Sequence, residues 1–457
     1  MAALALMTAA CSNDDNDLTQ QPAKAEGIPF TATISLDQSA TTRALTENGT
    51  TIEATWATGE KVALIYTVSA TTYVKEAEVT PQGDGTATIS TTLEGSPADD
   101  TDVTIVYPAS AVDGTTKDVK TNLLASQNGL LTGTGSIAEK YELRKTTTPA
   151  KLKIDGTTAS LKGTVSLTNQ NAIFKLTLKD IDGTSDVSAT SVVISDQTGV
   201  VTTVTPASGY ENAMYVALPT TATTLKFLVT GSDSKKYFNM ASSLSLSASY
   251  YQSTVKLATV GDVILSDGKF AARTSTGTKV AMIAYVGSDN GESSPYNHGL
   301  ALALSDAGSG SSLKWSTSNT KIHTYNTTSK SFTSEGGLQY KDATHNSDTY
   351  PAFKAAFANN STAAPTGCSD WFLASGYQWT KMIDACKNVL GTNNNCQDLR
   401  DGFNGISGAS NLLQSDYWSS TEYDSSYAWK IFFKSKGSWA ERTKGNNDYL
   451  VRACLAF

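Results

Sequence analysis

Apolar and polar residues alternate along short segments in the first 260 residues, with turn residues between the segments. The run from Phe30 to Leu36 alternates with a period of two, and Val62, Leu64 and Tyr66 share one face of their segment. A period of two is the side-chain repeat of a β-strand. Strands that are apolar on one face need a second sheet to cover them, so we predict that this region folds as β-sandwiches.

The alternating segments divide into two consecutive stretches, residues 27–150 and 151–260. The first shows no long segment of helical period and includes a strand-like run, 103–107, that is closed by Pro108. The second contains strand-like runs at hairpin-like intervals: 174–178, 214–219 and 225–229. We therefore predict two tandem sandwiches that meet near residue 150.

Residues 261–457 have a different character and are predicted to form an α+β domain. Ser375 is placed to cap a helix. Apolar side chains then recur at helical spacing, namely Trp379, Met382, Ile383, Cys386 and Val389. Strand-like segments at 280–286 and 428–433 complete the mixed pattern.

Composition and motifs favour a binding protein over an enzyme. The net charge is −8 and no basic stripe carries interleaved aromatic residues, so no nucleic-acid partner is expected. The chain shows no nucleophile elbow, phosphate-binding loop or metalloprotease motif. Its three histidines, His298, His323 and His345, are too scattered to suggest a triad. We expect no cofactor and no metal.

The start of the chain resembles a bacterial lipoprotein signal. Residues 2–10 form a short apolar run that ends in small residues, and Cys11 follows. An acidic stretch, 12–17, comes next and resembles the tether of lipoproteins that reach the outer cell surface. The resemblance implies that Cys11 carries a lipid, that residues 1–26 are signal and linker, and that the outer membrane is a partner.

The remaining four cysteines, Cys368, Cys386, Cys396 and Cys454, lie in the last quarter of the chain. An even set in one domain of an exported protein indicates two disulfides, which allows three connectivities. We favour Cys386–Cys396, which closes a short loop, and Cys368–Cys454, which ties the ends of the region together. Four free thiols are the alternative. Zinc is disfavoured because no CxxC pair or neighbouring histidine is present.

The first two stretches resemble the fimbrillin family, the subunits of type V pili. The resemblance rests on four segments in order: 41–44 (TTRA), 54–62 (ATWATGEKV), 107–108 (YP) and 215–219 (YVALP). It implies transthyretin-like, Greek-key sandwiches. It also implies a protease cut between Arg43 and Ala44 that releases the strand Phe30–Leu36. Another fimbrillin subunit then fills the open groove by donor-strand exchange.

The last stretch resembles a C-type-lectin-like domain found on surface proteins. The matching segments are 298–304, 371–379, 417–422 and 451–457. The resemblance implies a domain that binds a surface glycan or a protein ligand. The same fold is shared with enzymes that convert a cysteine to formylglycine, but Cys386 lies on the apolar face of the predicted helix and suits a structural role better.

A mixture of aromatic and amide or carboxylate side chains between 417 and 449 marks the predicted ligand site. Sugars need both, because a flat ring stacks on their C–H face and polar groups satisfy their hydroxyls. The candidate residues are Tyr423, Tyr427, Trp439, Asn446, Asn447, Asp448 and Tyr449. We expect Trp439 and the 446–449 loop to be exposed. Trp371, Trp418 and Trp429 are expected in the core.

These observations support three functional hypotheses. The first is a fimbrial tip adhesin at the cell surface, because a large folded domain after the second sandwich conflicts with donation of a C-terminal strand. The second is a glycan-binding surface lipoprotein that does not polymerise. The third is a modifying enzyme of the formylglycine-generating kind.

Overall fold

The computed structural model describes residues 27–36, 46–48, 51–53, 55–83, 85–241, 243–322, 332, 334–340, 345–390, 395–433 and 438–457. The predicted signal and linker with Cys11 lie outside these residues, as do Arg43, Ala44 and His323. The fold is mainly β, which confirms the prediction from the alternating pattern. None of the helices in the described ranges combines the length and the apolar content that a bilayer span requires.

The described chain forms two compact units. Unit 1 contains residues 27–36, 56–118 and 145–168, and unit 2 contains 46–53, 119–144 and 169–457, within these described ranges. The predicted boundary near residue 150 does not coincide with this division. The reason is that the segment after residue 144 returns to the first sheet, whereas 119–144 packs with the second sandwich.

Unit 1 is built on one nine-stranded sheet that curls around a single core. Its strands are β1 (Ile28–Leu36), β4 (Lys61–Val68), β5 (Thr71–Pro81), β6 (Thr86–Leu93), β7 (Asp102–Tyr107), β9 (Arg144–Lys145), β10 (Ala150–Asp155), β11 (Thr158–Leu161) and β12 (Val165–Asn169). The predicted face of Val62, Leu64 and Tyr66 is buried in this core, which confirms the period-two pattern.

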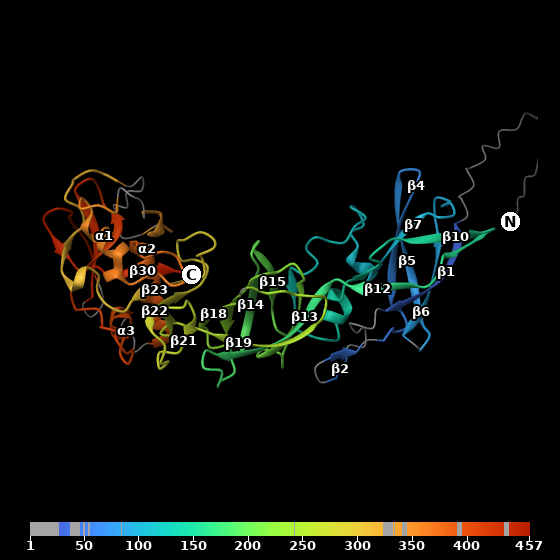
Figure 1. Cartoon of the computed structure of the whole chain (residues 1–457), viewed down its shortest axis with the longest axis horizontal. Helices are drawn as coiled ribbons and strands as arrows, with labels where there is room; N and C mark the ends of the chain where they lie inside the picture. Colours follow the sequence, from blue (N-terminus) through green and yellow to red (C-terminus); the bar gives the residue numbers. More distant parts are fainter. Residues whose placement is uncertain are drawn as a thin grey trace, which may run out of the picture. The chain divides into compact units, whose positions relative to one another are not determined.

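Strand β1 is inserted between strands on both of its edges (Figure 1). It pairs with β6 in antiparallel register from Ile28–Leu93 to Ser35–Thr86, and in parallel with β11 and β12. Alternate side chains enter the core, since Phe30 is 1% exposed and Ile34 is fully buried. The additional pairing between β1 and β6 connects the last strand of the sheet order back to β1 near its other end, so β1 closes the sheet on itself.

The second sandwich lies in unit 2 and packs a three-stranded sheet on a five-stranded one. The first sheet contains β16 (Ala213–Pro219), β13 (Asn171–Asp180) and β19 (Tyr250–Leu257). The second contains β18 (Lys236–Ala241), β17 (Leu225–Gly231), β14 (Ala189–Ser195), β15 (Val200–Val204) and β8 (Ser126–Gln127). In addition, a short hairpin of β2 (Thr46–Asn48) and β3 (Thr51–Glu53) belongs to unit 2.

The C-terminal region, residues 258–457, has the predicted α+β character. A six-stranded sheet contains β21 (Phe270–Ala271), β20 (Val263–Leu265), β22 (Lys279–Val286), β23 (Gly299–Ala303), β30 (Ala453–Ala456) and β25 (Phe372–Leu373). Side chains of β30 alternate between two cores, with Ala453 and Leu455 in one and Cys454 and Ala456 in the other. Both faces of this sheet are therefore covered.

Helices cover this sheet, and the predicted one is present as α2 (Gly376–Leu390). The backbone N–H of Gln378 donates to Ser375 Oγ at 3.2 Å, so Ser375 caps the helix as predicted. Trp379, Met382 and Cys386 are fully buried on its apolar face. Helix α3 (Asn395–Asp401) packs beside α2, and α1 (Pro351–Ala358) packs near β25 and β30.

The cysteines differ from the sequence-based prediction, because all four described thiols are free. Cys454 belongs to the core on one face of the six-stranded sheet, whereas Cys368 packs against the core on the other face. The predicted Cys368–Cys454 bond is therefore not formed in this structure. Cys386 and Cys396 share a core but are not joined either.

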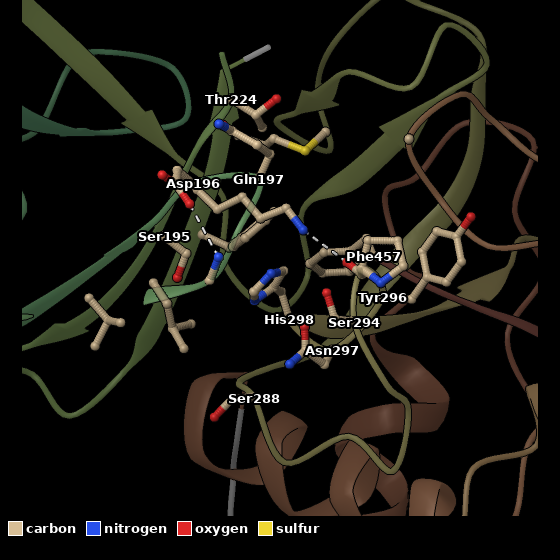
Figure 2. Close-up of a pocket in the computed structure, with 18 of the residues that line it drawn as sticks. Ser195, Asp196, Gln197, Thr224, Ser288, Ser294, Tyr296, Asn297, His298 and Phe457 are labelled. Carbon is tan, nitrogen blue, oxygen red and sulfur yellow. Dashed lines mark hydrogen bonds between the residues drawn. The ribbon is translucent and has the colours of Figure 1, made fainter. Parts of the chain in front are cut away.

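Within unit 2 the five-stranded sheet of the second sandwich meets the C-terminal region through aromatic side chains (Figure 2). Phe238 of β18 is 1% exposed and belongs to a core of the C-terminal region. Its ring centroid lies 5.3 Å from that of Phe457 and 5.2 Å from that of His298. The outer face of the five-stranded sheet is therefore partly buried against the C-terminal region.

Candidate functional site

The predicted ligand site lies on a small antiparallel sheet of the C-terminal region. Its strands are β26 (Asp416–Glu422), β27 (Tyr427–Phe432) and β28 (Ser438–Thr443). The turn between β26 and β27 is held by Asp424, whose Oδ1 accepts the backbone N–H groups of Ser426 and Tyr427 at 2.7 and 2.8 Å. Such an Asx turn orders a short loop without apolar contacts.

Five aromatic rings form a continuous row on one face of this sheet. Tyr427, Trp429 and Ile431 alternate onto that face, and Trp439 pairs with Ile431 across β28. Successive ring centroids along the row are 6.3, 5.5, 5.6 and 4.5 Å apart, in the order Tyr427, Tyr423, Trp429, Phe332 and Trp439. Tyr427 is 38% exposed at one end of the row, while Trp429 is 2% exposed in the middle. This aromatic row offers ring faces and a phenol to solvent at the Tyr427 end.

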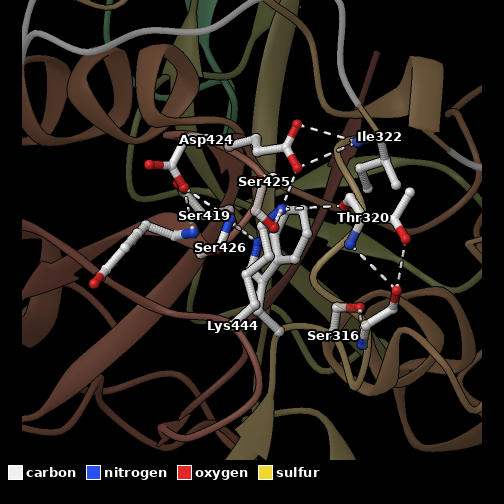
Figure 3. A network of polar contacts seen from close by, with 12 residues as sticks. Ser316, Thr320, Ile322, Ser419, Asp424, Ser425, Ser426 and Lys444 are labelled. Carbon is white, nitrogen blue, oxygen red and sulfur yellow. Dashed lines mark hydrogen bonds and ion pairs between the residues drawn. The ribbon is translucent and has the colours of Figure 1, made fainter.

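The loop after β28 is anchored by a buried ion pair between Lys444 and Glu422 (Figure 3). Both side chains are 0% exposed. Lys444 Nζ also donates to the carbonyl oxygens of Ser425 at 3.0 Å and Thr320 at 3.4 Å, and it lies 4.8 Å from the centroid of the Trp315 ring. Glu422 accepts the backbone N–H of Ile322 at 3.2 Å.

The ion pair joins three segments that are far apart in sequence: the 320–322 segment, the 422–426 turn and the start of the 444–449 loop. Burial lowers the pKa of Lys444, although the hydrogen bond and the charge of Glu422 oppose that effect. A buried charge is tolerated only where it is paired and hydrogen-bonded. This pair therefore fixes the base of the loop that carries the predicted polar residues.

The loop itself is only partly exposed. Asn446 and Asp448 are exposed, as predicted, but Asn447 and Tyr449 are half-buried. Asn447 Nδ2 donates to the Thr443 carbonyl oxygen at 3.2 Å. The Tyr449 ring lies 4.7 Å from that of Trp418 and under the Lys430 ammonium.

The structure divides the seven predicted residues between two faces of the sheet. Tyr423, Tyr427 and Trp439 lie in the aromatic row, whereas Tyr449 contacts Trp418 and Lys430, which belong to the opposite face. Trp439 was predicted to be exposed, but it is half-buried against Phe332. The two groups adjoin at the end of β28, where Tyr427 pairs with Thr443 and Thr443 bonds Asn447.

Three residues of this site were not predicted from the sequence: Phe332, Glu422 and Lys444. Phe332 stands in a Ser/Thr-rich stretch with no periodic neighbours. Lys444 and Glu422 are 22 residues apart, and no local pattern links them. Only the buried environment identifies the pair. In contrast, Trp371, Trp418 and Trp429 are buried as predicted.

The described thiols are not poised for nucleophilic chemistry. Burial raises the pKa of Cys368 to about 12 and that of Cys396 to about 11. Burial also raises the pKa of Cys386 and of Cys454. A thiol attacks as its thiolate, so these groups are in their unreactive form at neutral pH. The described residues contain no group of three or more His, Cys, Asp or Glu side chains arranged to hold a metal.

Comparisons with known proteins give distant structural likenesses. No protein-family model matches the chain, and no curated protein matches it. The chain is similar to a fimbrial protein from Bacteroides ovatus, with 14% identity and a TM-score of 0.35 over 94% of this chain and 99% of that one. It is also similar to a candidate cell adhesion protein from Bacteroides uniformis, with 18% identity and a TM-score of 0.29 over 52% and 94%. A candidate adhesin from Bacteroides ovatus shares 9% identity and a TM-score of 0.30 over 56% and 92%. These TM-scores are too low to carry an argument, so the function is argued from the contacts within the chain.

Proposed function

We propose that this protein is a cell-surface fimbrial adhesin that loses β1, accepts a strand from another fimbrillin subunit in its place, and presents the C-terminal region as a binding head. The observation that carries the proposal is the position of β1. It is inserted between β6 on one edge and β11 and β12 on the other, and its alternate side chains fill the core of unit 1.

Removal of β1 would leave a groove suited to another strand. Between Thr86 and Leu93, the backbone groups of β6 that face β1 would lose their partners, while the other edge of β6 stays paired with β5. An unpaired edge is a template for strand addition. The core would lose Phe30, Ile34 and Leu36, each of which contributes roughly 1.5–3 kcal/mol when buried. An incoming strand with apolar residues at alternate positions would restore both contributions.

The proposed cut after Arg43 falls between elements of different units. Strand β1 belongs to unit 1, and the β2–β3 hairpin belongs to unit 2. After a cut, β1 would be held by non-covalent contacts alone, while the new end at Ala44 would remain next to the hairpin. A strand retained only by pairing and packing can be exchanged.

We propose that the protein accepts a strand but donates none of its own, because the last strand of the second sandwich, β19, is held in its sheet. This strand pairs in parallel with β13 from Ile173–Tyr250 to Asp180–Leu257. Ala258 then bridges to Phe238, and the chain continues into β20 of the C-terminal region. Withdrawal of β19 would break the contact between the second sandwich and the head. We therefore assign the tip position, with a lipid on Cys11 holding the unprocessed form at the outer membrane.

The head is proposed to bind a surface glycan or protein through the Tyr427 end of the aromatic row together with Asn446 and Asp448. Exposed rings beside amide and carboxylate groups match the two faces of a sugar. We propose no enzymatic role, because the described thiols are kept protonated by burial.

The experiment that tests the proposal is strand exchange on purified protein. An arginine-specific protease is added, and a biotin-labelled peptide with the sequence of residues 27–36 is offered in excess. We expect cleavage after Arg43, loss of the native β1 fragment and stoichiometric capture of the peptide. The same peptide carrying Ile34→Asp should not be captured, and the Arg43→Ala protein should remain intact.

Cleavage without peptide uptake would contradict the proposal. If the protein is cut after Arg43 but takes up no peptide over days, β1 is a permanent strand and the protein is not an acceptor. The non-polymerising lipoprotein would then be the better explanation of the fold.

A further inference from the structure

A cavity of about 620 Å³ lies inside unit 2, between the second sandwich and the C-terminal region (Figure 2). Its walls come from β14, β17 and β18 on one side and from the loops around residues 268, 295 and 367 on the other. Cavities of roughly 300–1,000 Å³ are the usual size for small-molecule sites. The proposed function does not use this cavity, and binding in it is independent of strand exchange.

One wall of the cavity is apolar because the outer face of the five-stranded sheet is apolar there. Along β17, Leu225, Phe227 and Val229 point into the core of the sandwich, so Lys226 and Leu228 point outward. Leu228 of β17 and Met240 of β18 pack against the C-terminal region, although both strands belong to the second sandwich. A sheet face exposed to water would be polar at these positions.

Aromatic rings from both sides complete the apolar wall. The Phe238 centroid lies 5.5 Å from that of Phe270 and 5.3 Å from that of Phe457, and all three side chains line the cavity. These contacts hold the two walls together while leaving the space between Leu228, Met240 and Phe457 unfilled. A concave apolar wall of this size with a few polar groups beside it is the usual make-up of a small-molecule site.

The cavity also contains a half-buried cation, Lys226. Its Nζ donates to the carbonyl oxygen of Pro295 at 2.9 Å, and among the described residues no carboxylate lies within ion-pair distance. Burial lowers the pKa of Lys226, with no neighbouring charge that offsets it. The carboxylate of Asp196 lines the cavity too. Its Oδ1 is occupied by the N–H groups of Thr198 and Gly199 at 2.7 and 3.2 Å and by the Thr198 hydroxyl at 2.6 Å.

His298 lies beside this cation and supplies a neutral polar group. Its ring stacks on Phe238 with an interplanar angle of 19°. Its Nδ1 is buried and has no hydrogen-bond partner among the described residues. Burial and the charge of Lys226 lower the pKa of His298 to about 4, so the imidazole is neutral at pH 7. The site therefore has one positive charge, one unsatisfied imidazole nitrogen and an apolar wall.

We propose that this cavity binds a small amphipathic anion. The aliphatic or aromatic body of the ligand lies against Leu228, Met240 and Phe457, and its carboxylate or sulfonate pairs with Lys226 beside His298. Pairing compensates a cation that burial has partly desolvated, and the apolar body covers the apolar wall of the cavity.

The test uses 8-anilinonaphthalene-1-sulfonate as a fluorescent anion and octanoate as a competitor, with the full chain. We expect one saturable site, displaced by octanoate and much less by 1-octanol. Lys226→Gln should weaken both anions about tenfold, the loss expected for one charge-assisted hydrogen bond. Lys226→Arg should retain binding, because it keeps the charge.

Two further variants separate this cavity from non-specific binding. Lys256→Gln is a matched control, since its Nζ also donates to a backbone carbonyl, that of Asp182, but outside the cavity; it should bind as the parent does. Val193→Phe adds bulk to the cavity wall and should abolish binding of both anions while thermal unfolding by circular dichroism stays unchanged. Equal affinity of the parent, Lys226→Gln and Val193→Phe proteins would overturn the proposal. So would equal affinity for octanoate and 1-octanol.

Discussion

Lys444 and Glu422 are both 0% exposed, so each charge depends on the other for compensation. Removing one partner of a buried pair usually costs roughly 3–5 kcal/mol, because the remaining charge stays buried without a counter-ion. We therefore expect Glu422→Gln to lower the free energy of unfolding of the C-terminal region by about 3 kcal/mol. The measurement is urea unfolding followed by tryptophan fluorescence, which reports on this region because it holds six of the seven Trp residues.

Two comparisons make this prediction specific to the pair. The double variant Glu422→Leu with Lys444→Met should be more stable than Glu422→Gln, since it leaves no uncompensated charge. Asp348→Asn breaks the exposed pair between Lys354 and Asp348 and should leave the unfolding midpoint unchanged. A midpoint for Glu422→Gln equal to that of the parent would show that the pair does not hold the loop.

Glu47 is the residue that attaches the β2–β3 hairpin to the second sandwich. Its carboxylate accepts hydrogen bonds from Lys175 Nζ at 2.6 Å, Tyr215 Oη at 2.7 Å and Tyr250 Oη at 3.0 Å. Partial burial opposes ionisation, but these bonds outweigh it and lower the pKa of Glu47 below its ordinary value of 4.5. Because the folded pKa is the lower one, this contribution to stability is complete above pH 4.5 and is lost as the pH falls through the folded pKa.

We expect this pH dependence in the hydrogen exchange of the hairpin. After correction for intrinsic rates, amides of residues 46–53 should lose protection as the pH falls below 4.5 in the parent protein. In Glu47→Gln, protection should be low at every pH, because the amide carries no charge for Lys175. Protection that is the same in both proteins from pH 3 to 7 would contradict the role given to Glu47.

At the scale of elements, β1 closes unit 1 through its inward side chains. Ile34 is fully buried, and Thr33 beside it is exposed. Ile34→Ala should lower the opening free energy of β6 by about 2–5 kcal/mol, since it leaves a cavity and loses apolar contact. Thr33→Ala should change it by less than about 0.5 kcal/mol. Hydrogen exchange of the β6 amides, measured by mass spectrometry, gives both values.

Equal hydrogen exchange in the two variants would contradict the role given to β1. If Ile34→Ala and Thr33→Ala exchange alike, the core of unit 1 does not depend on β1, and its loss would not open an acceptor groove.

Strand β30 separates the thiols of Cys368 and Cys454 onto opposite faces of a sheet. Peptide mapping of the oxidised, unreduced protein should therefore yield no peptide that links Cys368 to Cys454. In native protein at pH 8, Cys386 and Cys454 should react with a thiol reagent far more slowly than in urea, because both are fully buried. A Cys368–Cys454 link in the map would require a different register for β30.

Over the whole molecule, the sequence predicts elements whose pattern is local. The period of two predicts the mainly β fold and the buried face of β4, and the spacing from Trp379 to Cys386 predicts α2 with its Ser375 cap. These features depend on neighbours a few residues apart, which a single sequence reveals.

Features made by distant residues were not predictable in the same way. The pairing of β1 with β12 joins residues more than a hundred positions apart, and its pairing with β6 joins residues more than fifty apart. The return of 145–168 to unit 1 leaves no mark on the alternation. The Glu422–Lys444 pair and the cavity around Lys226 are likewise made by residues that belong to no local sequence pattern and that only the fold brings together. The candidate ligand residues all lie on or beside one small sheet, but their division between its two faces depends on register, which a shift of one residue would reverse.

The most direct test of the account is the N-terminal sequence and intact mass of the protein recovered from fimbriae at the cell surface. Strand acceptance predicts a chain that begins at Ala44 and contains no β1, with a strand of another subunit retained after gentle washing and released by denaturant. A chain that begins at Cys11 and still carries Phe30 to Leu36 would contradict it.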